Sequence, residues 1–171
     1  ATITTTDQWP LEDEPHAIAR MLEALDRTLA LYPDGFFRQM KNTMGEGGVR
    51  FMPVGHIENA VNAIGLTYET YGWQNIYIDV TIDAFDGTIC HEIWHAIEGV
   101  LLTRNWDAIN QEEWAACNPA GFSYNEDAET PDSNPERWTF FYEFSAQDVY
   151  FVDAYSRTNA KEDRARIMEY I

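Results

Sequence analysis

The sequence predicts an α+β domain, and three features of its 171 residues lead to that prediction. Residues 12–32 carry apolar side chains at helical spacing, and so do residues 84–103. Between them, residues 75–80 (NIYIDV) alternate apolar and polar side chains, as a β-strand does. Helices that flank a small sheet are typical of an α+β fold, so we expect one domain over residues 1–171.

Two further segments of the first half add strands to the predicted sheet. Residues 49–55 (VRFMPVG) are strand-like, and Pro53 favours a place at an edge or an end because proline has no N–H to donate. Residues 64–73 (IGLTYETYGW) come just before residues 75–80 and can pair with them as a hairpin.

The second half of the chain contains a long loop and a final helix. Residues 117–137 include three prolines and several acidic residues, which predicts a loop without regular structure. The last residues, 160–171 (AKEDRARIMEYI), have the composition and spacing of a helix.

Composition excludes several classes of partner. Eleven lysines and arginines stand against 29 acidic residues, a net charge of −18, which would repel nucleic acid and anionic membranes. No apolar run approaches the roughly 18–20 residues of a membrane span. The two cysteines, Cys90 and Cys117, are too few for a disulfide framework, so they form one bridge or remain thiols.

The motif His91-Glu92-Ile93-Trp94-His95 lies within the helix predicted over residues 84–103. Two histidines at positions i and i+4 lie one helical turn apart and can bind one zinc ion, at about 2.1 Å from each imidazole. Glu92, beside the first histidine, can take a proton from a water on the metal. The alternative is that two polar histidines occupy a solvated helix face, because so short a pattern also occurs by chance.

A catalytic zinc needs a third protein ligand. A metzincin would have glycine at position 98 and histidine at position 101, but this chain has Glu98 and Leu101, which leaves a glutamate ligand. One candidate is Glu112 or Glu113, 17 or 18 residues after His95. That spacing is one or two residues short of the pattern in thermolysin-like peptidases.

A better candidate lies in the C-terminal stretch AYSRTNAKEDRARIMEYI. Five of its residues, in identity and spacing, resemble the zinc-ligand helix of anthrax lethal factor-like peptidases and related bacterial gluzincins: Tyr155, Arg157, Thr158, Asn159 and Glu162. This resemblance implies that Glu162 is the third zinc ligand and that the Tyr155 phenol stabilises the oxyanion. Without a metal, Asn159 and Glu162 could instead form a helix capping box.

The resemblance also implies a zincin-like fold and a peptidase mechanism. A small twisted sheet would pack on the helix that carries the histidines, and a C-terminal helix would bring Glu162. One zinc ion per chain, held by His91, His95 and Glu162, would activate water for attack on a peptide bond, with Glu92 as general base. Residues 75–80 are the candidate for the edge strand that holds a peptide substrate.

Three interpretations of function therefore stand beside one another. The first is a zinc peptidase acting on a peptide or protein, and the second is a zinc-binding module that captures peptides without turnover. The third is a structural domain with a chance motif. Since the resembling families are bacterial and mostly secreted or surface-anchored, we expect an extracellular or cell-surface protein; its oligomeric state stays open.

Several other side chains have more than one interpretation. Glu98 either orients a ligand histidine or is solvated, and Asp163 could bond to a histidine N–H. Phe122 and Tyr124 either line the cleft or pack under the loop. His56 has no partner in the sequence pattern and is expected to have no role in the site.

Overall fold

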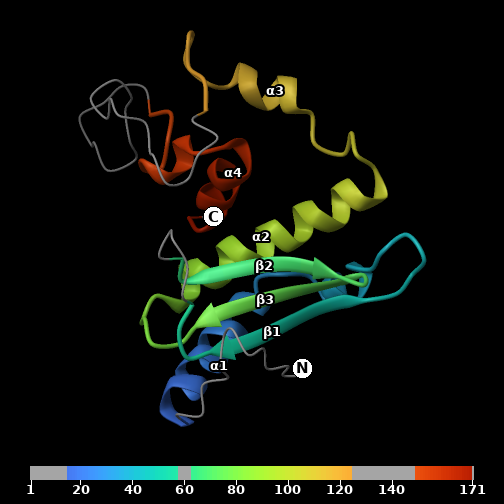
Figure 1. The fold of residues 1–171 in the computed structure, drawn as a ribbon, viewed down its shortest axis with the longest axis vertical. Coiled ribbons are helices and arrows are strands. Elements are labelled where there is room, and N and C mark those ends of the chain that lie inside the picture. The colour runs from blue at the N-terminus through green and yellow to red at the C-terminus, as the bar shows by residue number, and fades with distance from the viewer. Residues whose placement is uncertain (1–14, 58–62, 125–148, 171) are drawn as a thin grey trace. The chain divides into compact units, whose positions relative to one another are not determined.

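The computed structural model describes residues 15–57, 63–124 and 149–170 (Figure 1). The chain divides into two compact units, Ala1–Ile109 and Asn110–Ile171. The described residues form helices and a three-stranded sheet, which confirms the α+β prediction. The expectation of a single domain stays a prediction.

The first unit contains the sheet and two α-helices. Strand order is β1-β3-β2, with β1 parallel to β3 and β2 antiparallel to β3. In chain order, its elements are α1 (Pro15–Leu29), the 3₁₀ helix η1 (Phe36–Gln39), β1 (Gly48–Val54), β2 (Gly65–Thr70), β3 (Trp73–Asp79) and α2 (Phe85–Arg104). These bounds agree within a few residues with the predicted helices and strands; residues 12–14 of the first predicted helix lie outside the described residues.

The core of this unit lies between α1, α2 and one face of the sheet. Phe51 of β1 is the register partner of Ile76 of β3, and both belong to the same core cluster as Ile78. From α2, Ile89 and Ile93 are fully buried in this cluster. Burying each such side chain stabilises the fold by about 1.5–3 kcal/mol, so the predicted apolar stripe of α2 is what fixes the helix on the sheet.

The hairpin between β2 and β3 turns at Tyr71 and Gly72. Thr70 pairs with Trp73, so only these two residues form the turn, and both have positive φ angles, 50° and 80°. Positive φ at both positions is the type I′ geometry that matches the twist of a hairpin. The hairpin predicted for residues 64–73 and 75–80 is therefore confirmed.

The strand order confirms one prediction and corrects another. Pro53 lies on β1, an edge strand, as its missing N–H requires. In contrast, residues 75–79 lie in β3, which is the central strand of the sheet that the described residues form, and β2 is the edge strand that pairs with it in the antiparallel direction. The alternation of apolar and polar residues wrongly indicated a strand with one solvent-facing side. The polar side chains on the second face of β3 are in fact buried, with Asn75 and Asp79 only 6% and 2% exposed.

Asp79, the last residue of β3, holds the segment that follows β1 and the turn that precedes α2. One carboxylate oxygen accepts hydrogen bonds from the backbone N–H and hydroxyl of Thr81, at 2.9 and 2.6 Å. The other accepts from the Ile57 N–H at 3.2 Å and lies 2.9 Å from His56 Nδ1. Burial raises the pKa of Asp79, but the hydrogen bonds from Thr81, Ile57 and His56 outweigh it and hold the pKa below its usual value.

The second unit has short helices and a described loop segment. Its elements are α3 (Gln111–Ala116), the 3₁₀ helix η3 (Tyr155–Arg157) and α4 (Ala160–Met168). The last of these confirms the helix predicted near the C-terminus. Of the loop predicted over residues 117–137, residues 117–124 contain no helix or strand, and the remainder lies outside the described residues. In the part of the chain that the structure describes, no helix has the length and apolar character needed to cross a membrane.

Replacing Asp79 by asparagine should destabilise the protein at neutral pH. The neutral amide would lack the charge that strengthens four contacts, and we expect the free energy of unfolding to fall by about 2 kcal/mol at pH 7. Because the folded-state pKa of Asp79 is lowered, its stabilisation is complete above 3.8, the ordinary value, and is lost as the pH falls through the folded-state pKa. Urea unfolding at pH 7 and at pH 3 measures the difference.

The matched control for this prediction is Asp34→Asn, because Asp34 is exposed. It removes the same charge from the surface and should leave the free energy of unfolding nearly unchanged. An Asp79→Asn protein as stable as the control at pH 7 would contradict the role of the Asp79 contacts.

Candidate metal site

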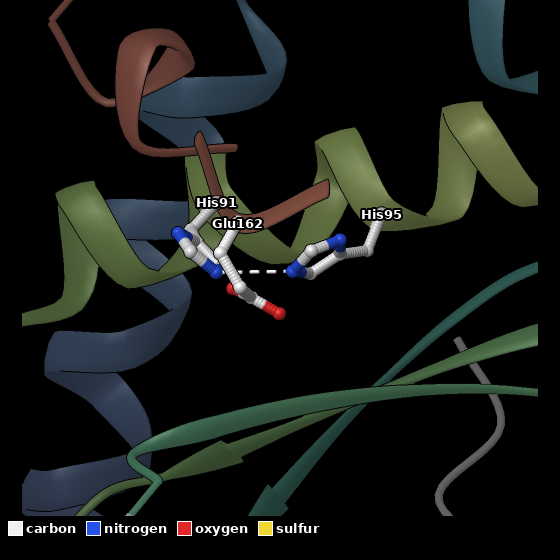
Figure 2. Close-up of side chains that lie close together, drawn as sticks. All are labelled: His91, His95 and Glu162. Atoms are coloured by element: carbon white, nitrogen blue, oxygen red, sulfur yellow. Dashed lines mark hydrogen bonds between the residues drawn. The ribbon is translucent and has the colours of Figure 1, made fainter. Parts of the chain in front are cut away.

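His91 and His95 lie side by side on α2, away from the apolar stripe. Their Nε2 atoms are 3.0 Å apart and their ring centroids 4.7 Å apart, with the rings nearly perpendicular (Figure 2). His91 is 9% exposed and His95 is half-buried. The two imidazoles therefore do not occupy a solvated helix face, which was the alternative for this motif.

The close approach of the two Nε2 atoms limits the tautomers of the pair. A hydrogen bond between them requires one Nε2 to carry a hydrogen and the other to accept it. Two zinc ligands in tetrahedral geometry lie roughly 3.3 Å apart when each is about 2.0–2.1 Å from the ion. The pair thus needs a shift of only a few tenths of an ångström, with the one Nε2 hydrogen moved to Nδ1, to offer two lone pairs to one ion.

Glu92 is held between α2 and the edge strand β2. Its side chain is 5% exposed, and the Thr67 hydroxyl donates to its Oε2 across 2.6 Å. Gly65 shares a face of β2 with Thr67 and lies so close to Glu92 that a Cβ added to Gly65 would be 2.7 Å from Glu92 Cγ and Oε1. Glu92 is thus a buried carboxylate with a defined partner, consistent with a residue kept for proton transfer.

Glu98 extends the row of polar side chains on α2. It is only 2% exposed, so the interpretation of Glu98 as a solvated glutamate is wrong. Trp94, between the two histidines, is half-buried, and its indole Nε1 is buried with no hydrogen-bond partner among the described residues. The sequence pattern could not show that Glu98 is buried, because charged residues on a helix are usually exposed.

In the second unit, Glu162 lies in the first turn of α4, and Tyr155 begins η3. The Asn159 side chain accepts hydrogen bonds from the backbone N–H groups of Lys161 and Glu162, at 2.9 and 3.0 Å. Asn159 is therefore the N-cap of α4, as the capping alternative predicted. This cap is made by the backbone N–H of Glu162 and not by its carboxylate.

Asp163 has a partner that differs from the expected histidine. Tyr124 donates a hydrogen bond to its Oδ2 across 2.7 Å, and Trp114 Nε1 donates to the same Tyr124 hydroxyl across 2.9 Å. Burial raises the pKa of Asp163 to about 6, since the bond from Tyr124 offsets only part of the cost of burying the charge. Tyr124 is therefore packed within the second unit, which is the simpler of its two interpretations.

The alternative third ligands, Glu112 and Glu113, lie in the first turn of α3 and are exposed. Their backbone N–H groups donate to the Asn110 side chain, which caps the helix. Among the described residues, the group of possible metal ligands consists of His91, His95 and Glu162 and contains neither of these two glutamates.

Sequence reasoning missed the contacts of Thr67 and Gly65 with Glu92 and the pairing of His56 with Asp79. For the contacts of Thr67 and Gly65, the predicted hairpin did indicate that residues 65 and 67 share one face of a strand. Nothing in the sequence indicated that this face would meet Glu92.

Comparison with models of known protein families, with curated proteins and with solved structures finds no match.

Proposed function

We propose that the chain is a zincin-like, zinc-dependent peptidase in which His91, His95 and Glu162 hold one zinc ion. One observation supports this proposal above all. Each of the three side chains offers one ligand atom, and these atoms lie within 4.8 Å of one another (Figure 2). The sequence resemblance named the same three residues, with Glu162 far from the histidines in the chain.

The donor set suits zinc. Two imidazole nitrogens and a carboxylate oxygen are the ligands of many catalytic zinc sites, with one position kept for water. Glu162 would supply the carboxylate, and His91 and His95 the imidazoles.

The residues around such a site can divide the steps of peptide hydrolysis. When bound, zinc supplies Lewis acidity, which lowers the pKa of a bound water to about 7 and polarises the scissile carbonyl. The Glu92 carboxylate takes the proton of the attacking water and delivers it to the leaving nitrogen. The Tyr155 phenol, 38% exposed, donates a hydrogen bond to the carbonyl oxygen as negative charge develops on it.

The substrate in this proposal is a peptide or protein, and the chain is extracellular or attached to a cell surface. The second candidate is a structural domain in which the two rings bond to each other. A zinc-binding module without turnover is the third. Zinc content and turnover, measured separately, distinguish all three.

The first test is zinc content in wild type and Glu162→Ala. We expect about one zinc per wild-type chain by mass spectrometry. Loss of a direct ligand should weaken zinc binding, measured by competition with a chelator, by more than the roughly 10- to 100-fold seen when a ligand loses an outer hydrogen-bond partner. Wild type without zinc after reconstitution would leave the structural domain as the interpretation.

Glu112→Ala and Glu113→Ala are the matched controls, because each removes an exposed carboxylate from the first turn of a helix in the same unit. Zinc affinity should equal that of wild type in both. If one of them loses zinc while Glu162→Ala keeps it, the third ligand is that residue.

Glu92→Gln should separate zinc binding from turnover. Glutamine cannot take a proton from water, so we expect kcat to fall by at least about 10²- to 10⁴-fold while zinc content is unchanged. Cleavage of casein and of a fluorogenic peptide library measures turnover. If a zinc-loaded wild type cleaves neither substrate, the chain is a binding module.

Tyr155→Phe tests the proposed oxyanion donor. Removing one hydrogen-bond donor to a developing oxyanion typically costs about 10²–10³ in kcat, with KM little changed. Tyr150→Phe, at a residue of similar exposure (40%), is the control and should keep full activity. Equal activity of the two variants would show that Tyr155 has no part in the reaction.

A further inference from the structure

Among the described residues, the edge strand β2 makes two separate contacts with the Glu92 side chain. Thr67 Oγ1 lies 2.6 Å from Glu92 Oε2 and 3.1 Å from the Glu92 backbone oxygen. A hydroxyl has one hydrogen to donate, and a charged carboxylate oxygen is a stronger acceptor than a carbonyl oxygen. The short distance to Oε2 therefore identifies the carboxylate as the acceptor.

Gly65 supplies the second contact. A Cβ added at Gly65 would lie 2.7 Å from Glu92 Cγ and Oε1 and 2.8 Å from Thr88 Cγ2, which real Cβ atoms do not approach. The backbone of β2 thus lies directly against the carboxylate. Because Gly65 and Thr67 are two residues apart on one strand, the same face of β2 limits the side chain by contact and by hydrogen bond.

We propose that Thr67 is a positioning residue, whose hydroxyl, beside the glycine at position 65, holds Glu92 in the orientation in which it exchanges protons. This inference rests on the proposed function, since it concerns the general base of that reaction. A buried glutamate has three side-chain torsions, and an error of about 1 Å in the place of a reacting group can cost about 100-fold in rate. The contacts from β2 remove that freedom before substrate binds.

The test begins with the contact itself, in metal-free protein. The urea midpoints of Thr67→Val, Glu92→Met and the double variant form a cycle that measures the coupling of the two side chains. We expect Thr67→Val to lower the midpoint when Glu92 is present, because the buried carboxylate loses its donor. In the Glu92→Met background, the same change should have almost no effect.

The second measurement separates positioning from a purely structural role. For zinc-loaded Thr67→Val, we expect kcat on a fluorogenic peptide to fall about 10- to 100-fold, with KM within about twofold of wild type and zinc content unchanged. Thr67→Ser keeps the hydroxyl and should recover most of kcat. Thr103→Val, which removes a hydroxyl that donates to the Gly99 carbonyl on α2, is the control and should behave as wild type.

Three results would overturn the inference. The first is additive effects in the urea cycle, which would mean that Thr67 does not hold Glu92. The second is coupling in the cycle with wild-type kcat in Thr67→Val, which would make the contact structural only. The third is loss of kcat in Thr67→Ser equal to that in Thr67→Val.

Failure of the proposed function looks different. Wild type would then bind no zinc or cleave no peptide, whatever coupling the urea cycle measures. Thr67 could then have no positioning role in catalysis. Coupling in the cycle, a lower kcat in Thr67→Val and recovery in Thr67→Ser together support the inference.

Discussion

The packing of α2 on the sheet is the constraint on which the rest of the first unit depends. Ile89 and Ile93 are completely buried in the core that Ile76 and Ile78 of β3 also line. An α-helix turns 100° per residue, so fixing this apolar stripe also fixes where His91 points. Apolar packing, and not polar contacts between the histidines alone, therefore orients the two candidate ligands on α2.

The hairpin positions the edge strand β2 relative to α2. The turn at Tyr71 and Gly72 sets the register of β2 against β3, and this register puts Gly65 and Thr67 on the face that meets α2. A slip of one residue would turn both to the opposite face and bring Leu66 towards the helix. The local geometry of Glu92 thus depends on a turn that lies 20 residues earlier in the chain, at Gly72.

The sequence predicted what depends on local periodicity. The stripe of α2, the hairpin and the Asn159 cap follow from side-chain spacing, and the histidine pair follows from the i, i+4 relation. Strand order did not follow, because Asn75 and Asp79 look like solvent-facing residues but are buried with hydrogen-bond partners. The contact of Thr67 with Glu92 could not be predicted either, because it depends on how β2 packs against α2.

The polar groups on α2 have partners within the first unit even without an ion. The two imidazoles bond to each other through Nε2, and Glu92 Oε2 accepts from Thr67. A structural zinc site, by contrast, has no stable arrangement of its ligands until the metal binds, and its chain unfolds without metal. The first unit, in contrast, has an apolar core of its own. Under the proposed function, zinc would therefore serve the chemistry of the site and not the folding of the first unit.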